Sequence, residues 1–466
     1  MKKTISKSLA LLLLVHAFTL VGSSCGPNTA LGKRSENVLR VASWDEYIDM
    51  GGEFLDPTDE DEAAYIAWYQ ETFGVDLLNT KPLYEEFEDW YKKETGKTIK
   101  VEYIPLQDNE TMYGKIKMGD EYDLLCPSEY MIMKLAAENR LQKYPESFFD
   151  ASIPTNYYAQ NVSPYIKTNF QNGKTLDGHT WWDYAAGYMW GSTGFVFNPQ
   201  KIGKTEAESR EIMSKWSCAT SQACNRKITA KDNVRDSYFM GLGLYYEELL
   251  EKGTLSNTEF YSNLSTYMND TTENTMSKVK KHLEKMRKNL YGLETDEAKN
   301  EVIAGRLDAS FQWSGDAVYI IDEAEKNDEP LYLEYSIPKS ASNLWFDGFV
   351  MMKGANVELS TAFVNFLSKP ENVIRNMYYI GYTSCIGGDT VFSYVEETYG
   401  DEEGDTEYPL SYFFGEGHTI LTTEEQTRRQ LFAQYPDEST KNRLVTMEYF
   451  DPETNERANR MWNNIK

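Results

Sequence analysis

The sequence predicts an α/β fold, and three observations support this prediction. Short segments rich in β-branched and aromatic residues alternate with helical segments along most of the chain. This alternation is typical of a parallel sheet with right-handed crossovers. The length of 466 residues allows two or three domains, or two lobes that share one chain, and 41% hydrophobic residues can fill their cores.

The first third of the chain shows the alternation most clearly. We expect strands at residues 38–43, 100–104 and 123–126. A helix over residues 83–95 ends at Gly96, a second helix is capped by Asn109 and ends near Gly119, and a third follows Ser128. The stretch 51–82 lies between the first strand and its helix, and the α/β unit does not need it.

The pattern continues through the rest of the chain. A strand-like segment covers residues 184–198, and we expect a break in it at Trp190-Gly191-Ser192-Thr193-Gly194. Further strands are expected at 227–230, 308–313, 331–337 and 346–352, and helices at 236–250, 317–325 and 359–367. Residues 389–430, like 51–82, lie outside the alternating strand and helix units.

The charge balance is strongly acidic, with 47 Lys and Arg against 73 Asp and Glu and a net charge of −26. Nucleic acid is therefore excluded as a partner, because its phosphates require a basic surface. Two acidic runs, 51–62 and 396–407, carry no Lys or Arg. Such runs are usually solvated, so we expect 51–82 and 389–430 to be acidic insertions on the surface, remote from the ligand.

The N-terminus predicts export. Lys2, Lys3 and Lys7 precede an apolar run over 9–21, and small residues lead to Cys25. We interpret residues 1–24 as a signal peptide that is too short to span a bilayer. The context resembles a bacterial lipoprotein site at which Cys25 is acylated; an ordinary signal with an incidental cysteine is the alternative. Either way, we expect a periplasmic or extracytoplasmic protein.

Four other cysteines, Cys126, Cys218, Cys224 and Cys385, allow three pairings. Cys218 and Cys224 could close a short disulfide loop in an oxidising compartment. Buried free thiols are the alternative for Cys126 and Cys385.

Candidate ligand-binding residues follow from topology. Ligands of open α/β sheets bind beyond the carboxyl ends of the strands. Aromatic and polar residues recur at four such ends, namely Trp44, Glu46 and Tyr47, then Ser128 and Tyr130, then Asn233 and Asp236, and finally Trp313 and Asp316. Because a single aromatic residue is more often part of a core, the recurrence carries the prediction.

Enzyme motifs are scarce. The sequence has no nucleophile elbow, no HExxH, no phosphate-binding loop and no dinucleotide fingerprint. No zinc or redox cysteine spacing occurs either, so we expect no cofactor and no metal. A glycosidase needs only two carboxylates, so a secreted glycan hydrolase stays open as an alternative.

Several segments, taken in order, resemble the bacterial polyamine-binding receptors of ABC importers, within the extracellular solute-binding proteins. They are Ser43-Trp44-Asp45-Glu46-Tyr47, Tyr122-Asp123-Leu124-Leu125-Cys126-Pro127-Ser128, Tyr188-Met189-Trp190-Gly191, Trp313-Ser314-Gly315-Asp316, Leu344-Trp345-Phe346-Asp347, Ile380-Gly381-Tyr382 and Leu444-Val445-Thr446-Met447. Taken in order, the resemblance extends over most of the chain apart from 51–82 and 389–430.

The resemblance implies a type II periplasmic binding protein, in which two lobes close on a ligand in a cleft bordered by hinges. The chain would cross between lobes near Trp190-Gly191, near Trp345 and within 385–400. The first lobe would comprise residues 36–190 and 346–395, and the second 191–345 and 396–466.

The resemblance also implies site residues. An aromatic box would contain Trp44, Tyr47, Tyr130, Trp313, Trp345 and Tyr382, and acidic clamps would be Asp347 and Asp236. Asp316, in its Trp-Ser-Gly-Asp context, makes the sequence more similar to the putrescine-binding members of the family than to the spermidine-binding ones. Asn233 stands where spermidine binders carry an acid, and Asp236 is shorter than the usual Glu. Helix capping by Asp316 and pairing of Asp347 with a structural lysine are alternatives.

We therefore predict a monomeric receptor, not an enzyme, that delivers putrescine or spermidine to a membrane ABC permease with a separate ATPase. Carboxylates can bind the ammonium groups of a polyamine, while aromatic faces cover its methylenes. A receptor of the same fold for another solute, or one that senses without transporting, is the further alternative.

Overall fold

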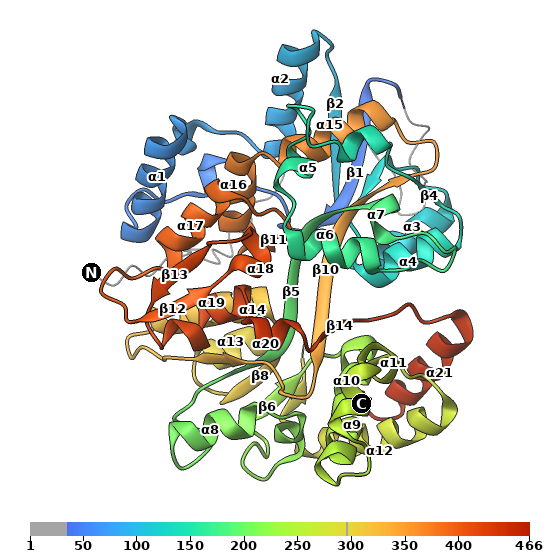
Figure 1. Cartoon of the computed structure of the whole chain (residues 1–466), viewed down its shortest axis with the longest axis vertical. Coiled ribbons are helices and arrows are strands. Elements are labelled where there is room, and N and C mark those ends of the chain that lie inside the picture. The colour runs from blue at the N-terminus through green and yellow to red at the C-terminus, as the bar shows by residue number, and fades with distance from the viewer. Residues whose placement is uncertain (1–34, 295–296) are drawn as a thin grey trace, which may run out of the picture.

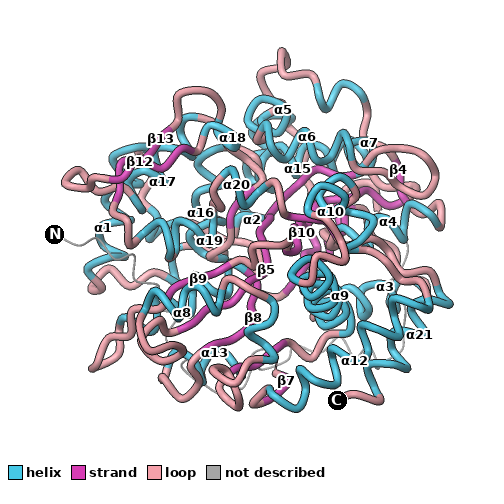
Figure 2. The backbone as a smooth tube through the Cα atoms, turned by 60° about the horizontal axis from the view of Figure 1, so that its bottom comes forward, coloured by secondary structure: helices cyan, strands magenta, loops and turns pink. Residues whose placement is uncertain are grey.

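The computed structural model describes residues 35–294 and 297–466, so the predicted signal peptide and Cys25 lie outside the described residues. It is a mixed α/β fold of two lobes (Figure 1). Strands run through the middle of the molecule, with helices around them (Figure 2). One large sheet has the strand order β2-β1-β3-β10-β5-β8-β6-β7.

The first lobe is built on three parallel strands. β1 (Val38–Trp44) pairs with β2 (Lys100–Leu106) on one side and β3 (Leu124–Leu125) on the other. The middle of β1 is buried on both faces, as expected of a parallel strand between helices. The helices of this part are α2 (Leu83–Thr95), α3 (Asn109–Met118), α4 (Glu129–Ala137), α5 (Tyr157–Asn161), α6 (Pro164–Asn172), α7 (Trp181–Tyr184), α15 (Val357–Leu367) and α16 (Pro370–Ile380).

The second lobe repeats the arrangement. β6 (Ile228–Ala230) pairs in parallel with β7 (Gly292–Leu293) and β8 (Ala309–Trp313). Its helices are α8 (Glu206–Met213), α9 (Val234–Glu251), α10 (Asn257–Ser262), α11 (Leu264–Met268), α12 (Glu273–Asn289), α13 (Glu297–Ile303), α14 (Ser314–Glu325) and α21 (Pro452–Asn463). A separate hydrophobic cluster fills this half, centred on Trp216, Phe311 and Leu283.

Two long antiparallel strands, β5 (Ala185–Phe197) and β10 (Ser342–Met352), connect the lobes side by side (Figure 1). Every residue of both strands is buried. The register shifts between Asp347 and Gly348, which marks a β-bulge. Short strands flank this pair, namely β4 (Leu141–Gln142), β9 (Glu334–Ser336), β11 (Thr383–Ser384) and β14 (Leu444–Thr446).

Most predicted elements are present, but two local predictions were wrong. No break interrupts β5, because its glycines serve close packing. A Cβ on Gly191 would lie 2.3 Å from Ser314 Oγ, and one on Gly194 would lie 2.5 Å from the Ser336 carbonyl oxygen. Asp108, not Asn109, caps α3, since its carboxylate accepts a hydrogen bond from the amide of Thr111.

The two acidic segments are not simple surface decorations. Residues 51–82 contain α1 (Glu60–Phe73), whose carboxylate cap is Asp59. Tyr65 of α1 stacks on Tyr378 with ring centroids 3.7 Å apart. Glu62 is buried, and the other acidic side chains of 51–62 are exposed or half-buried. The segment therefore has a packed side and a solvated side.

Residues 389–430 contain α17 (Asp389–Tyr399), the hairpin β12 (Thr406–Pro409) and β13 (Thr419–Thr422), and α18 (Ser411–Phe414). Val391, Leu410 and Phe413 are fully buried and belong to the cluster that fills the first lobe. This packing places part of 396–466 against the first lobe, whereas the expected division assigned it to the second. The short helices α19 (Gln430–Gln434) and α20 (Glu438–Lys441) follow.

Cys126, Cys218, Cys224 and Cys385 are buried free thiols, so the possible loop through Cys218 and Cys224 is not closed. Among residues 35–294 and 297–466, no helix is both long and apolar enough to cross a bilayer.

Candidate functional site

A cavity of about 960 Å³ lies beyond the carboxyl ends of the strands and is lined from both lobes. All twelve residues predicted from the sequence line it, namely Trp44, Glu46, Tyr47, Ser128, Tyr130, Asn233, Asp236, Trp313, Asp316, Trp345, Asp347 and Tyr382. They come from the ends of β1 and β8, the starts of α4, α9 and α14, the strand β10 and the residues after α16. Folding therefore brings all the predicted residues together.

Aromatic rings form one wall of the cavity. The ring centroid of Tyr382 lies 6.0 Å from that of Tyr47 and 5.4 Å from that of Trp345. Trp345 is fixed by a hydrogen bond from its Nε1 to the carbonyl of Ser192, at 3.1 Å. Gly315 admits Tyr382, because a Cβ at this position would lie 1.9 Å from the Tyr382 ring. The rings are thus held in a defined arrangement.

Asp347 lies at one end of this wall and is 6% exposed. Its Oδ2 accepts hydrogen bonds from Trp44 Nε1 at 3.1 Å and from the Tyr47 hydroxyl at 2.8 Å. Its Oδ1 is buried and has no hydrogen-bond partner in the described part of the chain. Burial raises the pKa of Asp347, while the polar groups of Ser128, Tyr47 and Trp44 oppose the rise. This carboxylate can accept a donor from a ligand.

Glu129 is a second buried acid on the same side, and sequence reasoning missed it. Burial raises its pKa to about 8, and the nearby Asp347 adds to the rise. The amide of Phe346 and the charge of Arg235 act in the opposite direction. Its position between the predicted Ser128 and Tyr130, in the first turn of α4, was the available signal.

Asp316 lies at the other end of the cavity and is 5% exposed. It contacts Lys231 Nζ at 3.3 Å and Lys299 Nζ at 2.9 Å, and it accepts a hydrogen bond from the Tyr382 hydroxyl at 3.0 Å. Burial by itself would raise the pKa of Asp316, but the two lysines outweigh it and hold this pKa below its ordinary value.

Sequence reasoning also missed Lys231 and Lys299. Lys231 directly follows β6, so the strand-end rule could have identified it. Its Nζ lies 3.6 Å from the centroid of the Trp313 ring, within the range of a cation–π contact. Lys299 is the third residue of α13. The strand before this helix, β7, was not among the expected strands, so there was no comparable signal for Lys299.

Two predicted residues, Asn233 and Ser128, have structural roles as well. Asn233 caps α9, accepting hydrogen bonds from the amides of Arg235 and Asp236. Burial raises the pKa of Asp236, and the charges of Lys231 and Arg235 oppose this rise. Ser128 accepts a hydrogen bond from Asn109 Nδ2 at 3.0 Å.

Glu46 is exposed towards the cavity with a φ of 53°, in the left-handed region that non-glycine residues rarely adopt. Strain of this kind concentrates at functional sites. Tyr130 is covered by the guanidinium of Arg235, at 4.2 Å from the ring centroid.

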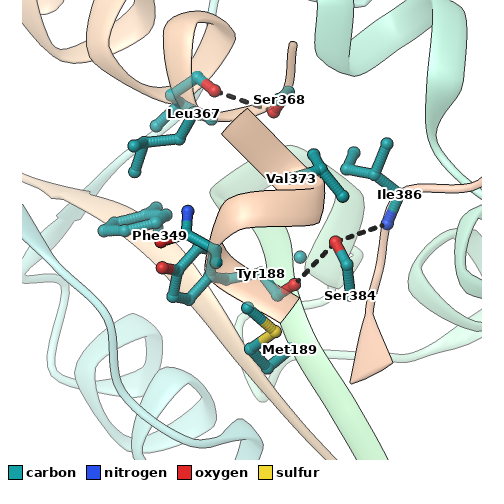
Figure 3. Close-up of a pocket in the computed structure, with 11 residues that line it drawn as sticks. Tyr188, Met189, Phe349, Leu367, Ser368, Val373, Ser384 and Ile386 are labelled. Atoms are coloured by element: carbon teal, nitrogen blue, oxygen red, sulfur yellow. Dashed lines mark hydrogen bonds between the residues drawn. The ribbon is translucent and has the colours of Figure 1, made fainter. Parts of the chain in front are cut away.

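A second cavity next to β5 and β10 is much smaller, about 10 Å³ (Figure 3). Phe349, Leu367, Val373 and Ile386 give it a largely apolar lining. Its volume matches a single water molecule at most, so this cavity cannot hold an organic ligand.

The groups that line the large cavity are suited to binding an organic cation. In the described residues, no group of three or more His, Cys, Asp or Glu side chains could hold a metal ion. Carboxylates next to aromatic faces are the groups that recognise organic cations. Two lobes joined by paired strands around such a cavity define a solute-binding receptor.

Comparison of this chain with known protein families agrees with its assignment as a solute-binding receptor. The chain belongs to the bacterial extracellular solute-binding protein family, whose model matches residues 84–387. It is a solute-binding protein of an ABC importer, located outside the cytoplasm, and a receptor instead of an enzyme. This membership sets aside the alternative of a glycan hydrolase.

Curated relatives support the assignment. The spermidine/putrescine-binding periplasmic protein of Salmonella typhimurium is 26% identical over 295 residues, which cover 63% of this chain and 71% of the relative. The putrescine-binding periplasmic protein SpuD of Pseudomonas aeruginosa is 24% identical over 361 residues, covering 76% and 79%.

Solved structures share the fold. The spermidine/putrescine ABC transporter substrate-binding protein PotD of Streptococcus pneumoniae has a TM-score of 0.58 at 23% identity, covering 92% of this chain and 98% of its own. The TpPotD lipoprotein of Treponema pallidum has a TM-score of 0.55 at 15% identity, covering 92% and 99%.

Proposed function

We propose that this receptor binds an amine of the polyamine class, putrescine or spermidine, and delivers it to a membrane ABC permease with a separate ATPase. The observation that carries the proposal is the environment of Asp347. This buried carboxylate has an acceptor oxygen without a partner in the described residues and lies beside Trp44 and Tyr47. A ligand ammonium would supply the missing donor.

The physical chemistry of the ligand matches these groups. Removing an ammonium group from water is unfavourable by on the order of several kcal/mol unless a partner replaces the water. A carboxylate provides that partner through charge-assisted hydrogen bonds. Aromatic faces add roughly 0.5–2 kcal/mol per cation and cover the methylene chain. The names of the curated relatives point to the same class of ligand.

The proposal includes the domain arrangement and the anchor. The two lobes, 36–190 with 346–395 and the part of 396–466 that packs on them, and 191–345 with the remainder, would close around β5 and β10 as hinges and exclude water from the ligand. Acylation of Cys25 would tether the receptor to the bacterial membrane.

Calorimetric titration of the purified protein with putrescine and spermidine tests the proposal. We expect binding of at least one of them. Asp347→Asn should lower the affinity by about 2–5 kcal/mol, or at least about 30-fold, because it removes the buried charge and leaves the shape. Asp405→Asn, at an exposed position of the 389–430 segment, is the control and should leave the affinity unchanged.

Two results would contradict the proposal. The first is the absence of binding by every polyamine tested, and the second is unchanged affinity in Asp347→Asn.

A further inference from the structure

Lys231 is a completely buried lysine that contacts the cavity residues Asp316 and Trp313. Its Nζ lies 3.3 Å from Asp316 Oδ2 and 3.6 Å from the centroid of the Trp313 ring. A carboxylate and an aromatic face are the two contacts that an ammonium group requires when it leaves water. The chain therefore supplies its own ammonium at this end of the cavity.

Asp316 has little capacity for another cation. Lys299 Nζ lies 2.9 Å from its Oδ1, and the Tyr382 hydroxyl donates to the same oxygen at 3.0 Å. Two lysines already share this one carboxylate, and the only other described acid whose charge is resolved at Lys231 is Asp236. A ligand ammonium placed here would be the third cation around Asp316 and would be repelled.

The other end of the cavity differs. The first-lobe residues that line it include six acids, Asp45, Glu46, Asp108, Glu110, Glu129 and Asp347, and no described lysine or arginine. Asp347 has hydrogen bonds from Trp44 and Tyr47 but no described cation within salt-bridge distance. The cation on this side is Arg235 of the second lobe, which covers the Tyr130 ring and whose charge acts on Glu129. Asp347 thus has no described cation of its own, while Asp316 already has two.

We propose that Lys231 replaces one ammonium of a diamine, so that the receptor prefers an amine with a single cationic end. The ammonium of this ligand binds at Asp347, and its other end carries a hydrogen-bond acceptor that faces the two lysines. A mono-N-acylated polyamine and an ω-amino acid share this chemistry. The inference rests on the proposed function, because it requires an amine bound at Asp347.

The ranking of three ligands tests this inference without any mutation. Putrescine has two ammonium groups, N-acetylputrescine has one ammonium and an amide, and 4-aminobutyrate has one ammonium and a carboxylate. We expect the native protein to bind N-acetylputrescine or 4-aminobutyrate at least about tenfold more tightly than putrescine, because repulsion acts only on the diamine. The better of the two identifies the acceptor as an amide or a carboxylate.

The variant Lys231→Met provides a second test of the inference. This variant removes the ammonium and keeps an unbranched apolar chain beside Trp313. Asp316 still has Lys299 and Tyr382 as partners, but it now has room for a ligand ammonium. We expect putrescine to bind Lys231→Met at least about tenfold more tightly than it binds the native protein, with a loss of affinity for the single-ended amines.

Lys227→Met is the matched control, since Lys227 precedes β6 and its side chain is 43% exposed. Its ligand ranking should equal that of the native protein, and thermal unfolding verifies that each variant is folded. If Lys231→Met does not fold, the ranking in the native protein decides by itself.

The inference and the proposed function fail in different ways. Tighter binding of putrescine than of both single-ended amines by the native protein would overturn the inference alone, provided that Asp347→Asn still weakens binding. If none of the three amines nor spermidine binds the native protein, both are overturned.

Discussion

Asp347 and Asp316 are both buried in the large cavity, but their surroundings are opposite. Asp316 is paired with Lys231 and Lys299, and these cations hold its pKa below the ordinary value against the effect of burial. Asp347 has only neutral donors, and burial raises its pKa. Residue type is therefore a poor guide to which carboxylate can receive a cationic ligand.

Glu129 yields a pH-dependent prediction. Its folded-state pKa of about 8 lies above the ordinary 4.5, so the folded protein holds a proton that the unfolded chain releases. The contribution of protonated Glu129 to the free energy of unfolding is fully present below pH 4.5, and it is lost as the pH rises towards and through about 8. Glu129→Gln should reduce the fall in unfolding free energy over this window, by up to about 1 kcal/mol per pH unit.

Chemical denaturation at several pH values measures this effect. Glu110→Gln, an exposed acid in the same cavity, should keep the native pH profile. Parallel profiles for the native protein and Glu129→Gln would show that Glu129 does not hold the proton.

At the scale of elements, glycines set how closely helices and strands approach the site. Gly191 lies on β5 against Ser314 and Trp345, and Gly315 lies in the first turn of α14 against Tyr382. Each position has no space for a side chain. The wall of rings therefore depends on positions that contribute no side chain of their own.

Gly315→Ala should displace the Tyr382 ring, because the added Cβ would lie 1.9 Å from that ring. We expect an affinity loss of about tenfold, or about 1.4 kcal/mol, in calorimetric titrations of the bound amine. Gly114→Ala is a suitable control, since Gly114 lies within α3 with open space around it. This control should retain affinity and gain roughly 0.5–1 kcal/mol in stability.

Packing of the 389–430 segment leads to a second prediction about an element of the fold. Phe413 is fully buried and stacks on Trp190 of β5, with ring centroids 5.3 Å apart. Phe413→Ala should therefore lower the free energy of unfolding by about 3–5 kcal/mol, measured by denaturant titration. Leu421→Ala, at a 42% exposed position of the same segment, should change it by less than about 0.5 kcal/mol. Similar values for the two variants would mean that the segment is a surface decoration after all.

At the scale of the whole molecule, the two lobes have separate hydrophobic clusters but share the strands β5 and β10. The cavity takes its lining from both lobes, so a ligand adds contacts across the division. Binding should therefore stabilise the complete protein instead of one half.

An amine present at 100 times its dissociation constant should raise the free energy of unfolding by about 2.7 kcal/mol. Thermal unfolding with and without putrescine or N-acetylputrescine measures this gain. The same concentration should give no comparable gain in Asp347→Asn, because the affinity of that variant is lower. An equal gain in both proteins would place the ligand away from Asp347.

Prediction from the sequence was most successful where the signal is local. The strand at Val38–Trp44 and the helix at Leu83–Thr95 follow from apolar periodicity and from the stop at Gly96. The strand-end rule located residues of the cavity, because it follows from the topology of parallel sheets. The resemblance to known receptors added Trp345, Asp347 and Tyr382 to this set.

Prediction failed where a residue's role depends on distant partners. The glycines of β5 look like a break until Trp345 and Tyr335 are packed against them. The acidic runs look solvated, because charge composition does not reveal that Tyr65 or Phe413 will be buried beside them.

The sequence by itself determined the α/β class, the order of most elements and twelve of the residues that line the cavity, since these follow from local periodicity, strand ends and ordered motifs. Only the tertiary structure decided the charge state of that cavity. Lys231 and Asp316 are separated by 85 positions in the chain, and the neutralisation of one carboxylate but not the other depends on the distances that folding creates. Electrostatic interactions act through space, so no spacing along the chain could have predicted which end of the cavity already contains its cation.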